Sequence, residues 1–250
     1  MKQVVRAGVH LVNSALRPIG VQLAGIQHDR YIGIDPRIPQ IYERVKSLTQ
    51  TSRDRVFCLC EAVQHIAKAK VAGDFVECGV FKGGSAMAAA LMMLYVKDCR
   101  TMHLYDTFTG MPPPSKKDFD YTGRSAFDEQ AWHASAGRGW TKADEHEVTA
   151  NMASTGYDMS RVILRKGMVE TTIPNQAPDK IAILRLDTDW YESTKHELQH
   201  LWPRLSSGGV LIIDDYGHFT GARDAVDEFF AEQPIFLFRI DYTGRMAIKH

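Results

Sequence analysis

The sequence lacks any stretch of concentrated positive charge. Its 250 residues include 30 Lys and Arg against 30 Asp and Glu, so the formal net charge is +0 at pH 7 and the pI is about 7.1. Proteins that bind nucleic acids usually present a basic patch or stripe to the phosphate backbone. The charge balance therefore argues against a nucleic-acid partner. The rest of the composition, 44% hydrophobic and 24% charged, is that of an ordinary globular protein.

Cysteine is scarce, and its spacing is not that of a zinc site. The chain has four cysteines, Cys58, Cys60, Cys78 and Cys99. Cys58 and Cys60 form a CxC pair rather than CxxC, and no paired Cys/His set follows them. We therefore expect reduced thiols and a cytoplasmic protein.

No apolar run near the start is long enough to span a membrane. Four residues interrupt it, namely His10, Asn13, Arg17 and Pro18. Apolar residues still recur at helical spacing, at Val5, Val9, Val12 and Leu16. This pattern predicts a short amphipathic helix that packs on the domain or on a partner subunit. Loose attachment to a membrane surface is the alternative.

No linker rich in Pro, Ser and Gly separates two apolar halves of the chain. We therefore expect one domain with appended pieces, a helical extension over residues 1–50 and a domain over residues 51–250. One long polar connection, from Phe108 to about Asp158, carries several aromatic residues. Connections of this length are usually functional or disordered, and the aromatic residues favour a lid over the substrate.

Strands and helices alternate from Thr51 onward. A helix is predicted over residues 51–73, and strands are predicted at 75–80, 101–107, 162–169, 181–188 and 208–217. Their apolar runs are continuous, as in parallel strands covered on both faces. Residues 235–240 and 245–250 then read as an antiparallel hairpin. The expected fold is a doubly wound, mostly parallel seven-stranded α/β sheet of Rossmann-like type, with an antiparallel C-terminal hairpin.

The first predicted strand leads into the glycine turn FVECGVFKGGS. This turn lacks both GxxxxGK[ST] and GxGxxG, which argues against a P-loop and against a nicotinamide oxidoreductase. Glu77 at the strand tip would repel a pyrophosphate but would suit the ammonium and sulfonium of S-adenosylmethionine. Asp106 ends the second strand, where an acid can accept the ribose hydroxyls of a nucleoside. Alternatively, the glycines only let the helix pack tightly on the strand.

Acidic residues end the fourth and fifth predicted strands. Asp187 follows the fourth strand, and Asp214 and Asp215 follow the fifth. Neighbouring strand tips lie about 5 Å apart, so we expect the three carboxylates to converge, without a lysine or arginine among them. Such oxygen ligands suit Mg²⁺, with Mn²⁺ as an alternative. Asp189 and Glu192 are expected to serve as turn and helix-start residues instead.

Four segments together resemble a known enzyme family. ECGVFKGGS, LYDTFTGMP, LRLDTDWYEST and GGVLIIDDYG are similar to the macrocin O-methyltransferase (TylF-like) family, and the resemblance runs from about Thr51 to the C-terminus. It implies a class I methyltransferase fold, S-adenosylmethionine and Mg²⁺ as cofactors, a homo-oligomer, and methylation of a sugar hydroxyl. It also implies that Asp187, Asp214 and Asp215 are the metal ligands, and that Asp187 is the general base.

We expect nine residues to contact the cofactor: Glu77, Gly79, Val80, Gly83, Gly84, Ser85, Asp106, Thr107 and Gly167. The acceptor is expected to be a small-molecule sugar or glycoside, on a natural product or a polysaccharide precursor. A catechol- or phenol-directed O-methyltransferase remains an alternative, as does a non-catalytic adenosine-binding scaffold domain. His133 and His218 are either substrate contacts or exposed loop residues.

Overall fold

The computed structural model describes residues 12, 18, 33–135 and 142–250. The chain divides into two compact units, Met1–Pro36 and Arg37–His250. All that follows concerns the second unit. The amphipathic helix predicted around residues 5–16 lies outside the described residues, Val12 excepted. Among the described residues, no helix is both long and apolar enough to cross a membrane.

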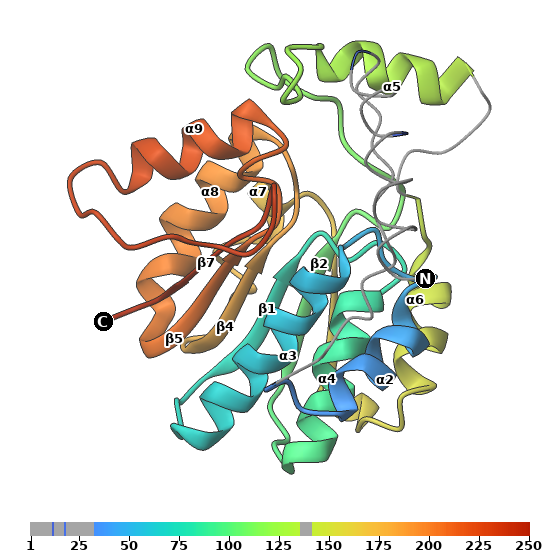
Figure 1. The fold of residues 1–250 in the computed structure, drawn as a ribbon, viewed down its shortest axis with the longest axis vertical. Helices are drawn as coiled ribbons and strands as arrows, with labels where there is room; N and C mark the ends of the chain where they lie inside the picture. Colours follow the sequence, from blue (N-terminus) through green and yellow to red (C-terminus); the bar gives the residue numbers. More distant parts are fainter. Residues whose placement is uncertain (1–11, 13–17, 19–32, 136–141) are drawn as a thin grey trace. The chain divides into compact units, whose positions relative to one another are not determined.

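A seven-stranded sheet forms the centre of this unit, with the strand order β3-β2-β1-β4-β5-β7-β6 (Figure 1). Strands β1 to β5 are parallel, and β7 pairs antiparallel with both β5 and β6. The expected mostly parallel sheet with a C-terminal hairpin is confirmed. The strands are β1 (Asp74–Cys78), β2 (Met102–Asp106), β3 (Val162–Lys166), β4 (Ile181–Leu186), β5 (Leu205–Ile213), β6 (Phe238–Arg239) and β7 (Arg245–Ile248).

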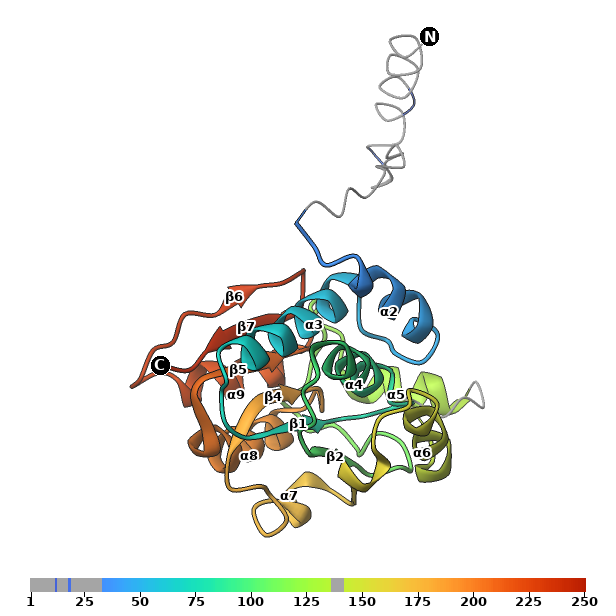
Figure 2. The same ribbon diagram turned by 90° about the horizontal axis from the view of Figure 1, so that it is seen from below.

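Helices cover both faces of the sheet, as Figure 2 shows, with α2, α3 and α4 on one face and α8 and α9 on the other. The helices are α2 (Arg37–Val45), α3 (Arg53–Lys68), α4 (Gly84–Val96), α5 (Ala126–Ser135), α6 (Glu145–Ala153), α7 (Val169–Thr172), α8 (Tyr191–Leu201) and α9 (Thr220–Phe229). Two short 3₁₀ turns, η2 (Met159–Arg161) and η3 (Trp202–Arg204), precede β3 and β5.

Local sequence signals set the helix boundaries. The Ser52 side chain accepts a hydrogen bond from the backbone N–H of Arg55 and so caps α3, as the Thr-Ser start predicts. Helix α8 ends at Leu201, since Pro203 cannot continue it, and that proline lies in η3. Leu198 and Leu201 are fully buried against the sheet, as their spacing predicts. Strand β4 is buried along its whole length, because helices cover both of its faces.

The connection expected to form a lid, residues 108–158, is anchored on the domain at both ends. Near its start, the indole N–H of Trp190 donates to the Pro112 carbonyl at 3.0 Å. The buried Asp118 carboxylate accepts from the backbone N–H of Tyr191 at 2.9 Å. Near its end, α6 packs on α4 and β3. Residues 136–141 lie outside the described part, and closure over a substrate stays a prediction.

The segment expected to be an N-terminal extension also contacts the domain. Helix α2, within residues 1–50, packs on α3 and α4 and belongs to the same compact unit as the sheet. The expected boundary at residue 50 therefore falls between two helices that contact each other.

Candidate functional site

A cavity of about 410 Å³ opens at the carboxyl ends of the parallel strands. It lies where the strand order reverses between β1 and β4, the usual ligand site of an open α/β sheet. Its walls come from distant parts of the chain: residues 49–51 before α3, the turn after β1, the ends of β2, β4 and β5, and Tyr242 in the hairpin turn.

Glycine is required at two positions around this cavity. Gly79 has φ +83°, and a Cβ there would lie 2.6 Å from the carbonyl carbon of Asp187 and closer still to its oxygen. At Gly84 a Cβ would lie 2.6 Å from the backbone of Leu48. The turn therefore packs directly on the end of β4, and the segment before α3 packs directly on α4. Close packing therefore requires glycine at both positions, and a cofactor contact at Gly79 stays a prediction.

Asp106 fixes the shape of the glycine turn. Its Oδ2 accepts hydrogen bonds from the backbone N–H groups of Val80 and Phe81 at 2.8 and 3.1 Å. Its Oδ1 accepts from the N–H of Phe108 at 2.8 Å. The carboxylate thus connects the turn after β1 to the end of β2, and it lines the cavity between them.

Six of the nine expected cofactor residues line the cavity: Gly79, Val80, Ser85, Asp106, Thr107 and Gly167. The Ser85 hydroxyl lies 3.2 Å from that of Thr49 and 3.3 Å from that of Thr51, so it joins α4 to the segment before α3. Glu77, Gly83 and Gly84 are not among the lining residues. Residues 49–51 also form part of the wall, and no sequence motif predicted that.

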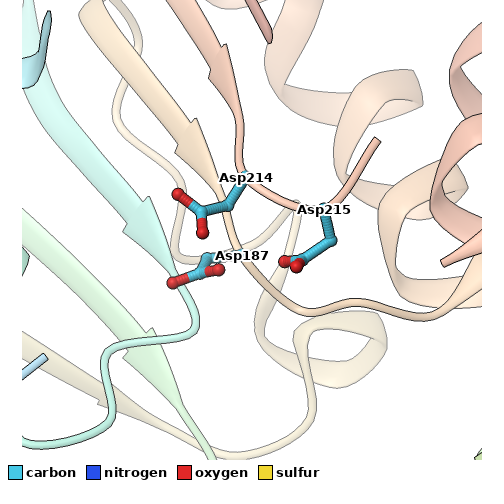
Figure 3. Close-up of side chains that lie close together, drawn as sticks. All are labelled: Asp187, Asp214 and Asp215. Carbon is cyan, nitrogen blue, oxygen red and sulfur yellow. The ribbon is translucent and has the colours of Figure 1, made fainter. Parts of the chain in front are cut away.

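The three aspartates at the strand tips converge, as expected. One carboxylate oxygen each of Asp187, Asp214 and Asp215 can be chosen so that the three lie within 4.8 Å of one another (Figure 3). The parallel pairing of β4 with β5 produces this, because the N–H of Asp214 donates to the Leu186 carbonyl at 2.9 Å. The presence of a metal ion among them stays a prediction.

The expectation that no lysine or arginine lies among these acids is wrong. The buried guanidinium of Arg185 contacts three carboxylates: its Nη1 lies 2.7 Å from Glu77 and 2.8 Å from Asp187, and its Nη2 lies 2.6 Å from Asp214. Arg55 of α3 pairs with the other oxygen of Asp214. The sequence contained a signal for these ion pairs. Arg185 is the charged residue within the otherwise apolar strand IAILRL, and a buried charge requires partners.

Glu77 occupies a different environment from the one expected. It is fully buried, and its cationic partner is Arg185 rather than a ligand at the cavity wall. Burial raises the pKa of Glu77 to about 7, even though Arg185 opposes the shift. Its Oε2 accepts no hydrogen bond from any described residue.

Carboxyl groups outnumber guanidinium groups in this cluster. The two guanidinium groups of Arg55 and Arg185 face six acids, namely Glu77, Asp187, Asp189, Asp214, Asp215 and Asp241. The Oδ2 of Asp215 is buried and accepts no hydrogen bond from the described residues. An excess of carboxylates with an unused buried oxygen suits a hard divalent cation, so the residues present fit Mg²⁺.

The pKa values of these acids reflect the same imbalance. Burial, together with neighbouring carboxylates, raises the pKa of Asp187 and of Asp215 well above the usual range. Burial also raises the pKa of Asp189 to about 8. Without a cation, the cluster therefore retains protons that isolated aspartates would lose.

Asp189 and Glu192 behave differently from each other. Glu192 lies in the first turn of α8, as expected. Asp189 is a turn residue with φ +67°, but it does not cap the helix. The N-cap residue is Trp190, and the side chain that accepts from the first N–H group of α8 is that of Asp118. Asp189 lines the cavity and interacts with Asp215 instead.

The two histidines also differ. His218 lines the cavity just after Asp215. His133 lies in α5, and its side chain is outside the described part.

Comparisons with known proteins connect this site to an enzyme family. The sequence model described as "Macrocin-O-methyltransferase (TylF)" matches residues 28–247. A demethyldecarbamoylnovobiocin O-methyltransferase of Streptomyces niveus is 34% identical over 190 residues, which cover 74% of this chain and 69% of the relative. An 8-demethyl-8-(2,3-dimethoxy-α-L-rhamnosyl)-tetracenomycin-C 4′-O-methyltransferase of Streptomyces olivaceus is 32% identical over 202 residues, which cover 80% of this chain and 69% of the relative.

The fold comparison gives the same result. The solved structure of the O-methyltransferase NovP has a TM-score of 0.70 and 29% sequence identity, and the match covers 81% of this chain and 82% of NovP. The seven-stranded sheet with its antiparallel C-terminal strands is the class I, Rossmann-like fold of such enzymes. The chain therefore belongs to the macrocin-O-methyltransferase (TylF) family and is an S-adenosylmethionine-dependent O-methyltransferase.

Proposed function

We propose that the chain transfers the methyl group of S-adenosylmethionine to a sugar hydroxyl on a glycosylated natural product, with Mg²⁺ bound at the site. The observation that carries the proposal is the acidic cluster of Asp187, Asp214 and Asp215, which opens onto the cavity beside the glycine turn. The names of two relatives support the choice of acceptor, since they refer to demethyldecarbamoylnovobiocin and to a rhamnosyl tetracenomycin.

The cofactor is proposed to occupy the part of the cavity between the glycine turn and Gly167. Gly79 and Val80 would lie along it, Ser85 and Thr107 offer hydroxyl groups, and Asp106 offers carboxylate oxygens to the ribose. For Glu77, Gly83 and Gly84 we propose an indirect role, because these residues shape the turn and the acidic cluster without lining the cavity.

Asp187, Asp214 and Asp215 would hold the divalent cation. Arg185 and Arg55 each take one oxygen of Asp214, and Arg185 also takes Oδ2 of Asp187. These ion pairs fix the carboxylates in place before a cation arrives. Mg²⁺ bound there would supply positive charge that lowers the pKa of a nearby acceptor hydroxyl, and Mn²⁺ has suitable chemistry as well.

Asp187 is the proposed general base. It lines the cavity, its side chain is 25% exposed, and Arg185 holds one of its oxygens. Asp187 takes the proton of the acceptor hydroxyl while the acceptor oxygen bonds to the methyl carbon. The bond from that carbon to sulfur breaks, and its electron pair stays on sulfur. The methyl group is already activated by the sulfonium, so the chain's task is to align the reactants and accept the proton.

A methyl-transfer assay tests the proposal and separates it from its nearest rival. The purified chain is incubated with S-adenosylmethionine and either methyl α-L-rhamnopyranoside or catechol, with Mg²⁺ or with EDTA. We expect a methylated sugar that forms only with Mg²⁺, detected by mass spectrometry. Methylation of catechol alone would favour a phenol-directed enzyme, and equal rates in EDTA would remove the metal from the mechanism.

A thermal melt tests cofactor binding without an acceptor. S-adenosylhomocysteine should raise Tm, because a ligand that binds only the native state stabilises it, and NAD⁺ should not. Stabilisation by NAD⁺ instead would contradict the proposal.

A further inference from the structure

Three aromatic side chains meet at the mouth of the cavity, next to the acidic cluster. Tyr121 precedes α5, His218 lies between β5 and α9, and Tyr242 lies in the turn between β6 and β7. Their ring centroids are 5.4 Å apart for Tyr121 and His218, 6.2 Å for Tyr121 and Tyr242, and 6.1 Å for His218 and Tyr242. His218 and Tyr242 line the cavity, and Tyr121, which is not a lining residue, contacts both of their rings.

The two tyrosine rings of the group are exposed, whereas His218 is half-buried and packs against Phe219. Tyr121 is 67% exposed and Tyr242 is 53% exposed. Exposed aromatic residues that gather beside a cavity are typical of binding sites, because they leave apolar surface for a ligand to cover.

Hydrogen bonds to two aspartates hold the turns that carry the tyrosines. The Asp120 carboxylate accepts from the N–H groups of Thr122 and Arg124 at 2.8 and 2.9 Å, and Asp120 forms a β-bridge with Phe219. The Asp241 carboxylate accepts from the N–H groups of Thr243 and Gly244 at 2.9 and 2.7 Å.

The third ring is held on the same framework. The N–H of Gly217, the residue before His218, donates to the Thr243 carbonyl at 2.9 Å. The three rings therefore stand on backbone that is already ordered, so a ligand loses little free energy in organising them.

We propose that Tyr121, His218 and Tyr242 form an aromatic platform that binds the sugar ring of the acceptor, an inference that rests on the function proposed above. A pyranose presents C–H groups on its faces and hydroxyl groups around its edge. The electron-rich face of an aromatic ring suits the C–H groups. The Tyr242 hydroxyl lies 3.3 Å from Nδ1 of His218, so these two polar atoms hold the rings together.

The platform lies next to the acids proposed to bind the metal. The backbone N–H of His218 donates to the Asp215 carbonyl at 3.0 Å, so the platform and the acidic cluster share one turn of chain. A sugar ring held against the platform therefore lies beside the turn that carries Asp215, and a carboxylate oxygen of Asp187 lies within 4.8 Å of one of Asp215. The platform thus selects which hydroxyl reaches the base.

Binding of a free monosaccharide tests the platform without requiring catalysis. Methyl α-L-rhamnopyranoside and methyl β-D-glucopyranoside serve as probes for the full chain saturated with S-adenosylhomocysteine, with binding followed by saturation-transfer difference NMR. Tyr242→Leu and Tyr121→Leu remove a ring, whereas Tyr242→Phe keeps it. Phe236→Leu removes an 81% exposed ring that does not line the cavity.

We expect each Tyr→Leu variant to weaken binding of the recognised probe by about three- to tenfold, as for the loss of one aromatic contact. Tyr242→Phe and Phe236→Leu should remain within about twofold of the wild type, and the affinity for S-adenosylhomocysteine should be the same in all variants. Wild-type affinity in both Leu variants would overturn the platform, as would failure of the wild type to bind either monosaccharide.

The outcomes separate the platform from the proposed function. Methyl transfer to a sugar with a KM that neither Leu substitution changes would leave the function standing and remove the platform. Ring-dependent binding of a monosaccharide without any methyl transfer would support the platform and count against the function. Ring-dependent binding of catechol but of neither monosaccharide would overturn the assignment to a sugar.

Discussion

Glu77 of β1 and Arg185 of β4 are register partners in the parallel ladder, and their side chains form a buried ion pair with 2.7 Å between Oε1 and Nη1. The same guanidinium contacts two of the acids proposed to bind metal. The centre of the sheet thus carries the counter-charge for the site at its edge.

Removing that counter-charge should destabilise the fold. Arg185→Met leaves Glu77 and Asp214 with one cation fewer in a buried environment, and we expect a loss of about 3–5 kcal/mol in the free energy of unfolding, measured with urea. Arg185→Lys should not restore stability, because one ammonium cannot span three carboxylates. Arg161→Met breaks an exposed pair with Asp158 and should change stability little. Equal effects of the two Met substitutions would contradict the structural role of Arg185.

Asp187→Asn should separate catalysis from cofactor binding. The amide cannot accept the hydroxyl proton, so we expect kcat to fall by roughly a hundredfold to ten-thousandfold. Calorimetric affinity for S-adenosylhomocysteine should stay near that of the wild type. Turnover within a factor of two of the wild type would remove Asp187 from the role of base.

Asp215→Asn should have opposite effects with and without metal. Without a divalent cation, the variant removes one carboxylate from an acid-rich cluster, so its Tm should be higher than that of the wild type. Adding Mg²⁺ should raise the Tm of the wild type, by mass action, but not that of the variant. Both melts are recorded after EDTA treatment and again after adding Mg²⁺. An equal Mg²⁺ response in both proteins would place the cation elsewhere.

Gly79→Ala tests the close approach of the glycine turn to β4. The new Cβ would collide with the backbone of Asp187, and the backbone would also be held at φ +83°. Gly123→Ala is the matched control, because Gly123 has φ +84° with nothing within 4 Å of a Cβ. The control should lose about 1–2 kcal/mol in the free energy of unfolding, from backbone strain alone.

Gly79→Ala should lower the free energy of unfolding clearly more than Gly123→Ala does. It should also weaken S-adenosylhomocysteine binding. Chemical denaturation and calorimetry check the two effects. Equal losses of stability at the two positions would mean that the turn has room to move away from Asp187.

The buried acid Glu197 of α8 should make stability depend on pH. Burial raises its pKa from 4.5 to about 8, although Thr188 donates to it at 2.9 Å. The folded state therefore holds the proton more tightly than the unfolded state, so stability is full below pH 4.5 and declines as the pH rises toward about 8.

Glu197→Gln should make this decline shallower, by at most about 1.4 kcal/mol per pH unit. Urea unfolding across that range measures the slope. Glu232→Gln, at an exposed position, should keep the wild-type slope. A variant slope equal to that of the wild type would mean that Glu197 is ionised in the folded state.

The sequence allowed the sheet to be predicted because its strands are apolar, evenly spaced and bounded by turns. Asp187, Asp214 and Asp215 could be placed together because parallel strands end at one edge. Arg55 could not be placed there, since its contact with Asp214 depends on how α3 lies over the sheet. The pairing of Glu77 with Arg185 depends on strand register, which the apolar runs of buried parallel strands do not specify. Asp189 looked like a cap because it stands just before a helix.

Other expectations remain predictions. They include the bound metal, the homo-oligomer, the cytoplasmic location and the role of the first residues. The predicted strand at residues 235–240 is shorter in the structure, where β6 contains only Phe238–Arg239. The hairpin nevertheless matters at the site, because its turn carries Asp241 and Tyr242.

The Ser52 hydroxyl donates to the Asp241 carboxylate at 2.6 Å, across 189 positions of sequence, and Arg55 joins the same carboxylate to Asp214. The start of α3 and the C-terminal hairpin are therefore joined beside the cavity, and both ends of the domain contribute to its wall. During translation, the acids at the strand tips leave the ribosome before the last hairpin does. At that stage the turn that carries Asp241 cannot yet hold them in place. Cofactor binding should therefore begin only after the last hairpin has left the ribosome.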